Sequence, residues 1–305
     1  MKKTIVVIIL LSLFVTSDYR AMASIQEDEI YDRAMRQDLL CLMMAYPEYV
    51  TDIESDAQGK VYVIMKSGRR LLYDDKRQKN PAEKLSNPDL QDMLEQVYPL
   101  LPVRSVLEEN YDPGRSRVYG LFSEVYGSSK QAVEAKLVSL NLGYGSYQFN
   151  GSNKAAESLK AAMNELVPLA RGNQSIGNCI FPSSGTYNYR LIAGTNQLSP
   201  HSYGIAIDLA VNKKDYWRWS SRTDGDKRLS AYPSEIVEVF EKNNFIWGGK
   251  WGHFDIMHFE YRPEVILKAR YFKDNQNIEK AWHDGVPLED VFIKNSIEKI
   301  NKKLK

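Results

Sequence analysis

The sequence is poor in two side chains that often carry chemistry: its 305 residues include four histidines and two cysteines. Two cysteines, Cys41 and Cys179, are too few for a disulfide-rich scaffold or a cysteine-based zinc site. One disulfide between them stays open, because the sequence does not show how far apart they lie. The formal charge is only +1. Nucleic-acid-binding proteins normally carry a clear basic excess, so we expect no nucleic-acid partner.

Long hydrophobic runs are also scarce, and the one near the N-terminus has the pattern of a targeting signal. Lys2 and Lys3 precede an apolar run over residues 4–15, and Ala21-Met-Ala23 resembles a cleavage site. This pattern predicts a signal peptide over residues 1–23. The run is short for a bilayer span, so a retained anchor is the less favoured alternative and no stable membrane span is expected after cleavage. The expected localisation is exported, either periplasmic or associated with the cell wall.

Hydrophobic periodicity divides the rest of the chain into several predicted elements. A three- and four-residue spacing predicts a helix over residues 25–46, and two apolar runs around Ser67-Gly68 predict a hairpin. Further predicted elements are helices over 115–126, 132–140 and 153–169, and strands over 187–193, 205–211, 245–247 and 256–261. Residues 141–152 are rich in Gly, Asn and Ser, which favours a domain boundary there. We predict an N-terminal accessory domain over 24–150, a catalytic domain over 151–275 and a C-terminal helical tail over 276–305.

Three of the four histidines lie in two short stretches. The first is Ser199-Pro-His-Ser-Tyr-Gly-Ile-Ala-Ile-Asp208, in which Gly204 allows a tight turn between His201 and Asp208. Asp208 stands in an apolar run, where an ionised carboxylate is costly unless something pairs with it. A metal ion would supply that partner. The alternative is a structural aspartate that is bonded to backbone amides.

The second stretch runs from Trp247 to Glu260. In a regular strand His258 and Glu260 would share a face, whereas Asp255 would point to the other side. Asp255 can lie beside His258 only if residues 255–257 bend, and the glycines upstream permit this. A lone His258 would be read as a core histidine. Together, however, His201, Asp208 and His258 form the three-ligand set of a catalytic zinc site, with a carboxylate left over as a base.

These motifs resemble a known family. Ser199-x-His201-x-x-Gly204-x-Ala206-x-Asp208, followed by Asp255-x-x-His258, is similar to the D-alanyl-D-alanine carboxypeptidase (VanY-type) and dipeptidase group of zinc peptidases. Those enzymes cut peptide bonds in bacterial cell-wall stem peptides. The resemblance covers roughly residues 153–263. It implies an α+β fold, a small antiparallel sheet with flanking helices (Hedgehog/DD-peptidase-like), beside a mixed N-terminal domain.

The resemblance also implies roles for individual residues. His201, Asp208 and His258 would bind Zn²⁺, Asp255 would be the general base, and Arg190 would polarise the substrate carbonyl. The remaining candidates to contact either the ligands or the substrate are Ser199, Glu260, Trp251 and His253. Ser199 has an alternative role in capping the loop before His201, and Glu260 is an alternative base. Trp247, Trp251 and the cluster over residues 216–219 would wall a groove for a stem peptide or a glycan, and core packing is an equal alternative for Trp247.

The expected function is therefore an exported zinc metallopeptidase that acts on peptidoglycan stem peptides. D-alanyl-D-alanine carboxypeptidase action is the favoured mode. The motifs do not distinguish carboxypeptidase, dipeptidase and endopeptidase action. The alternative is a non-catalytic exported protein that binds the cell wall and retains the fold and the metal. Asp255 favours the enzyme, because a binding protein has no need of a base. Arg115 and Arg117, beside the Asp112-Pro-Gly turn, would contact a carboxylate-rich substrate or the catalytic domain, or would be solvated.

Overall fold

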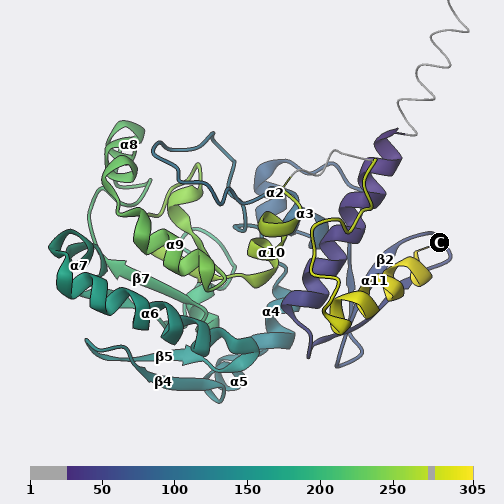
Figure 1. Ribbon diagram of the computed structural model, residues 1–305, viewed down its shortest axis with the longest axis horizontal. Helices are drawn as coiled ribbons and strands as arrows, with labels where there is room; N and C mark the ends of the chain where they lie inside the picture. Colours follow the sequence, from purple (N-terminus) through teal and green to yellow (C-terminus); the bar gives the residue numbers. More distant parts are fainter. Residues whose placement is uncertain (1–25, 274–278, 305) are drawn as a thin grey trace, which may run out of the picture.

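The computed structural model describes residues 26–273 and 279–304, so the predicted signal peptide lies outside the described residues. The fold is α+β, as predicted, and its sheets are small and antiparallel (Figure 1). The strands are β1 (Val50–Ser55), β2 (Val61–Met65), β3 (Arg70–Leu72), β4 (Leu137–Asn141), β5 (Ser146–Asn150), β6 (Ser183–Gly185), β7 (Ala206–Ala210), β8 (Phe245–Trp247) and β9 (His258–Tyr261).

Helices connect and cover these sheets. Residues 26–45 are helical, which confirms most of the helix predicted over 25–46. The other helices are α2 (Pro81–Ser86), α3 (Leu90–Leu94), α4 (Tyr119–Tyr126), α5 (Lys130–Glu134), α6 (Ala155–Gly172), α7 (Gln174–Ile180), α8 (Arg222–Ala231), α9 (Ser234–Lys242), α10 (Pro263–Tyr271) and α11 (Val291–Lys303). Three short 3₁₀ segments are η1 (Ser152–Lys154), η2 (Pro200–Tyr203) and η3 (Gly248–Lys250).

The C-terminal helix returns to the first part of the chain. Figure 1 shows α11 beside the helix of residues 26–45 and the β1–β2–β3 sheet. Lys303 Nζ lies 2.8 Å from Asp52 Oδ2 of β1, and Arg36 donates a hydrogen bond of 2.6 Å to the Leu304 carbonyl. The predicted C-terminal tail therefore packs on the predicted N-terminal domain.

The sheet that carries the candidate site has the strand order β6-β7-β9-β8. β7 supplies Ile207 and Leu209 to the core, and both are fully buried. Helix α9 packs against β8, and α6 packs against α9, α7 and the β4–β5 hairpin. The hydrophobic core runs from Met35 to Leu304 as one cluster. It joins residues on both sides of the predicted boundary at residue 150, and the division into domains stays a prediction.

Three predicted elements differ from the structure. The helix predicted over 132–140 is wrong beyond Glu134, because Leu137–Asn141 pairs with β5 as β4 and tertiary pairing outweighs local propensity. The helix predicted from residue 115 begins only at Tyr119. The strand predicted over 187–193 is absent, because its backbone bonds to η2 instead: Asn188 N donates to His201 O, and Arg190 N donates to Ser202 Oγ.

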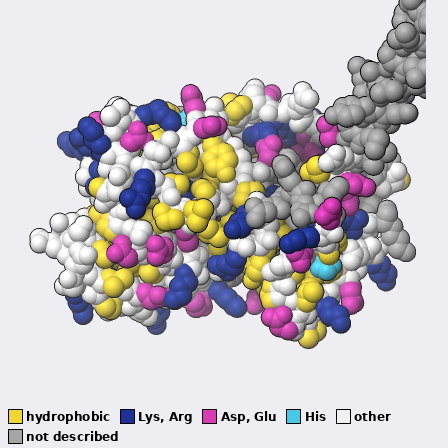
Figure 2. All heavy atoms as spheres, turned by 45° about the horizontal axis from the view of Figure 1, so that its top comes forward, with side chains coloured by type: hydrophobic (Ala, Val, Ile, Leu, Met, Phe, Trp, Pro, Cys, Tyr) yellow, Lys and Arg dark blue, Asp and Glu magenta, His cyan; other side chains and the backbone are white. Residues whose placement is uncertain are grey.

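Charges are mixed on the surface. Figure 2 shows one face on which Lys and Arg side chains are interspersed with Asp and Glu, and on which hydrophobic side chains gather between them. Cys41 is buried, Cys179 is half-buried, and both are free thiols. Among the described residues, we find no helix that combines the length and the apolar character needed to cross a bilayer.

Candidate metal centre

Two neighbouring strands and one turn bring three polar side chains to a single point. Asp208 of β7 and His258 of β9 are direct cross-strand partners in the antiparallel register. His201 lies in η2, which ends at Gly204 in the left-handed conformation with φ +65°. A Cβ at Gly204 would also lie 2.7 Å from Leu137 Cδ2. Glycine thus permits the tight turn that was predicted between His201 and Asp208.

The donor atoms of this group have the spacing of metal ligands. His201 Nε2 lies 3.3 Å from His258 Nδ1 and 3.2 Å from Asp208 Oδ1, and His258 Nδ1 lies 2.9 Å from Asp208 Oδ1. Ligands at about 2.0–2.1 Å from a tetrahedral zinc ion stand about 3.3 Å apart. The three atoms therefore fit a single metal ion, and all three residues line the same cavity.

The other ring nitrogen of each histidine is also engaged. His201 Nδ1 lies 2.6 Å from the carbonyl oxygen of Thr186, which fixes a proton on Nδ1 and leaves the Nε2 lone pair free for a metal. His258 Nε2 faces Glu260 Oε2 at 3.7 Å. This confirms the strand parity that predicted a shared face for His258 and Glu260. Such outer contacts hold metal-binding rings in one orientation.

Glu260 is itself held by an arginine that is remote in sequence. Arg117 Nε lies 2.9 Å from Glu260 Oε1, and Arg117 Nη2 lies 2.7 Å from Oε2, so the contact is a two-pronged ion pair. Both side chains are buried, and Arg262 adds a contact of 3.3 Å to Glu260 Oε1. A contact of Arg117 with the catalytic domain was one of three alternatives for this side chain. Its partner could not be identified from sequence, since 143 positions separate the two residues.

The electrostatics of the site favour positive charge at the ligand triangle. Although burial opposes it, hydrogen bonds to Asp208 and Glu260 raise the pKa of His258 to about 10. Burial likewise opposes ionisation of Asp208, yet His201 and His258 hold the pKa of this carboxyl well below its usual range. A metal cation bound in place of the His258 proton would be stabilised by the same two carboxylates, Asp208 and Glu260. The donor set thus suits a divalent metal ion.

Asp255 reaches the same cavity because the chain bends before β9. His258 N donates to Asp255 O at 3.1 Å, so residues 255–258 form a turn rather than a strand. Asp255 N donates to Gly248 O at 2.9 Å, and a Cβ at Gly248 would lie 2.4 Å from Asp255 O. Burial raises the pKa of Asp255 to about 7. Its Oδ1 atom is buried and has no hydrogen-bond partner among the described residues. A carboxylate in this state can exchange a proton near neutral pH.

A cavity of about 360 Å³ contains these groups and most other predicted site residues. Arg190 lines it, is exposed, and makes no ion pair with the described residues. Ser199 lines it too, but its Oγ accepts a bond of 3.4 Å from His201 N, which is the capping role. The lining residues are Leu85, Arg115, Arg117, Arg190, Ile192, Ala193, Thr195, Gln197, Ser199, Pro200, His201, Asp208, Tyr216, Trp217, Trp219, Trp251, His253, Asp255, Met257 and His258.

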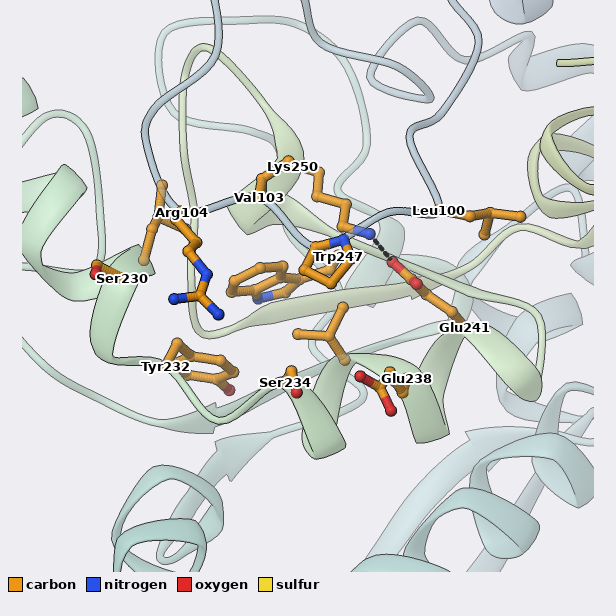
Figure 3. Close-up of a pocket in the computed structure, with 13 residues that line it drawn as sticks. Leu100, Val103, Arg104, Ser230, Tyr232, Ser234, Glu238, Glu241, Trp247 and Lys250 are labelled. Carbon is orange, nitrogen blue, oxygen red and sulfur yellow. Dashed lines mark ion pairs between the residues drawn. The ribbon is translucent and has the colours of Figure 1, made fainter. Parts of the chain in front are cut away.

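Trp247 belongs to a different cavity. Its side chain is 2% exposed, and Nε1 donates to Ile256 O at 2.7 Å, so it packs in the core. The second cavity, of about 230 Å³, is lined by Trp247, Arg104 and the ion pair of Lys250 with Glu241 at 2.6 Å (Figure 3). It contains none of the predicted metal ligands. Of the predicted groove walls, Trp217, Trp219 and Trp251 lie at the metal centre instead.

A second group of three carboxylates, Asp74, Asp75 and Asp89, lies close enough together to hold a metal ion. The side chain of Lys79 is 2% exposed, and its Nζ lies 3.0 Å from Asp75, 2.8 Å from Asp89 and 2.6 Å from Asp92. An ammonium group thus already fills the position that a metal ion would take. This group is an internal ion-pair network.

Comparisons with known proteins agree with the geometry. Residues 193–261 match the family model described as D-alanyl-D-alanine carboxypeptidase, which confirms the resemblance carried by the motifs. The matched segment contains His201, Asp208, Asp255 and His258 and excludes Arg117 and Arg190. The peptidoglycan L-alanyl-D-glutamate endopeptidase CwlK of Bacillus subtilis (strain 168) is 40% identical over 67 residues. These cover 21% of this chain and 40% of that protein, less than half of its length. No solved structure matches the chain.

Proposed function

We propose that this chain is an exported zinc metallopeptidase that hydrolyses peptide bonds in peptidoglycan stem peptides. The observation that carries the proposal is the metal-ligand triangle of His201, Asp208 and His258 beside Asp255, whose buried Oδ1 atom has no hydrogen-bond partner among the described residues and which lines the same cavity. Three ligands and a separate base are the inventory of a hydrolytic zinc site. A protein that only binds the cell wall would gain nothing from a buried aspartate that titrates near neutral pH.

The side chains have distinct tasks in this reaction. A bound zinc ion would polarise the attacking water and the scissile carbonyl. Asp255 accepts the proton of the water and later gives it to the leaving amine, and its pKa of about 7 suits both steps. Arg190, which lies on the cavity wall and makes no ion pair with the described residues, hydrogen-bonds the carbonyl oxygen as negative charge develops on it. Thr186 and Glu260 keep the rings of His201 and His258 in their ligating orientation.

Two observations bear on the bond that is cut. The family description names a carboxypeptidase, which favours removal of a terminal D-alanine. The named relative is an L-alanyl-D-glutamate endopeptidase, which makes cleavage within the stem peptide the second candidate. The cavity of about 360 Å³, lined by three tryptophans, is shared by both candidates. Both candidates use the same ligands and the same base.

The test is a digest of purified peptidoglycan with the chain from residue 24 onward, followed by mass spectrometry. We expect soluble or trimmed stem peptides with zinc, none after treatment with a chelator, and recovery when zinc is restored. Loss of a terminal D-alanine would identify carboxypeptidase action, and loss of the peptide after L-alanine would identify endopeptidase action. Absence of any product from the zinc-loaded protein would contradict the proposal.

A further inference from the structure

Residues 111–117 lie outside the family-matched segment and are nevertheless fixed against the turn that precedes His258. Gly252 N donates to Tyr111 O at 2.8 Å, and Trp251 Nε1 donates to Pro113 O at 2.8 Å. A Cβ at Gly252 would lie 2.0 Å from the Glu108 carbonyl oxygen, so the approach requires glycine. This segment is therefore held in place and contributes Arg115 and Arg117 to the wall of the cavity.

Asp112 organises this wall. Its carboxylate accepts bonds from His253 N at 2.9 Å and from His253 Nδ1 at 2.7 Å, and it pairs with Arg115 Nη1 at 2.8 Å. Three donors hold the carboxylate in place, so Asp112 anchors Arg115 by one nitrogen. Arg115 N also donates to Asp112 O at 3.0 Å, which fixes the start of the side chain. The guanidinium thus has a defined position before any substrate arrives.

The remaining nitrogens of Arg115 are available to a ligand. They make no hydrogen bond to the described residues, and the side chain is 22% exposed in the cavity. The guanidinium carbon lies 5.8 Å from the centre of the Trp251 ring, and that ring lies 5.7 Å from the ring of His258. The Trp251 ring therefore lies between the unpaired nitrogens of Arg115 and the proposed metal ligand His258.

The chemistry of a guanidinium selects the ligand. Its planar fork matches the two oxygens of a carboxylate, and such charge-assisted contacts are stronger than neutral hydrogen bonds. We propose that Arg115, anchored by Asp112, binds a free carboxylate of the peptide substrate close to the scissile bond, and that this contact makes the protein prefer acidic peptides over their amidated counterparts. This inference rests on the proposed peptidase function and adds the substrate class to it.

The experiment compares three synthetic stem peptides that contain D-glutamate and end in D-alanine. One keeps both free carboxylates, one has a terminal carboxamide, and one has the glutamate carboxylate converted to an amide. Wild type, Arg115→Gln and Arg115→Lys are assayed for kcat/KM on each peptide. Arg36→Gln is the matched control, because Arg36 also pairs with an aspartate, at 2.6 Å, and lies outside the cavity lining.

We expect the zinc-loaded wild type to prefer the free carboxylate over one of the two amides by at least about tenfold, as for a hydrogen bond to a charged group. The amidated peptide whose kcat/KM falls relative to the peptide with both free carboxylates identifies which carboxylate Arg115 binds. Arg115→Gln should bring the ratio close to one, Arg115→Lys should keep part of it, and Arg36→Gln should keep all of it.

An unchanged ratio in folded Arg115→Gln or Arg115→Lys would overturn the inference while leaving the peptidase intact. Failure of the wild type to cleave any of the three peptides would instead count against the proposed function. In that case, binding of the intact peptides by calorimetry decides the inference separately. Equal affinities of wild type and Arg115→Gln for the free-carboxylate peptide would overturn it.

Discussion

The two groups of metal-ligand side chains in this molecule differ in what neutralises them. At Asp74, Asp75 and Asp89, the Lys79 ammonium lies within 3.0 Å of Asp75 and Asp89. At His201, Asp208 and His258, the described residues place no lysine or arginine within 4.0 Å of the ligand carboxylate. Arg117 instead pairs with Glu260, the carboxylate that faces the other ring nitrogen of His258. Clustered carboxylates are therefore a candidate metal site only where the chain has not already supplied the cation.

The largest effect should come from removing one of the proposed metal ligands. His258→Ala leaves two ligands, so we expect loss of bound zinc and of hydrolysis down to the level of the uncatalysed reaction. Metal content by elemental analysis and product formation by mass spectrometry measure the two losses. Asp89→Asn in the lysine-filled group is the control and should retain zinc. Retention of stoichiometric zinc by His258→Ala would show that the triangle is not the metal site.

Asp255→Asn separates the base from the ligands. We expect kcat to fall by about 10²- to 10⁴-fold, because a general base is lost, while zinc content stays at one ion per chain. In the wild type, kcat/KM should rise with pH as Asp255 loses its proton, with a midpoint no higher than about 7 because a nearby cation favours the carboxylate. Loss of zinc from Asp255→Asn would instead make Asp255 a ligand.

Lys79→Met tests the lysine-filled group. It leaves Asp75, Asp89 and Asp92 without their counter-ion, so we expect destabilisation by up to about 3 kcal/mol, measured by urea unfolding. Millimolar calcium should restore part of the lost unfolding free energy in the variant and leave the stability of the wild type unchanged. Zinc affinity and kcat of the folded variant should equal those of the wild type. An effect of calcium on the wild type would contradict the idea that the ammonium occupies the site.

Arg117→Lys tests the outer contact on Glu260. The substitution keeps the charge but loses the two-pronged geometry, so His258 is held less firmly and zinc affinity should fall by about 10- to 100-fold. Competition with a chromophoric chelator measures the affinity, and the absorption spectrum of the cobalt-substituted protein reports the ligand geometry independently of activity. Arg36→Lys should change neither. An unaltered cobalt spectrum and affinity would reduce Arg117 to a role in packing.

The smallest effect is expected at an ion pair exposed to solvent. Lys242 and Glu165 pair at 2.9 Å, and their side chains are 68% and 41% exposed. Solvent screens such contacts, so Glu165→Gln should leave the unfolding temperature and zinc affinity unchanged. Scanning calorimetry checks this. A clear drop in unfolding temperature would mean that the contrast between buried and exposed ion pairs in this protein is weaker than described.

The parts of the site that are close in sequence could be predicted, and those that depend on remote packing could not. Gly204 signalled the turn between His201 and Asp208, and strand parity placed Glu260 with His258. The bend that brings in Asp255 could be stated only as a condition, because it depends on Gly248 and its contacts.

Remote packing decided the remaining elements. Arg115 and Arg117 had three alternative roles in the sequence, and only the tertiary structure shows that Arg117 contacts Glu260. The predicted strand over 187–193 failed for the same reason, since its backbone groups bond to a turn that lies 12 residues or more further along the chain. Signals from hydrophobic periodicity are local, whereas these partners are not.

Because of the contact between Arg117 and Glu260, the proposed peptide hydrolysis should depend on how completely the chain has folded. The two residues are 143 positions apart, and closing such a loop costs entropy that is recovered only when both halves pack. An isolated segment of residues 151–263 would hold every proposed metal ligand and the proposed base but would lack Arg117, which holds Glu260 beside His258. Cleavage activity should therefore appear late in refolding, after secondary structure, and coincide with the docking of residues 111–117.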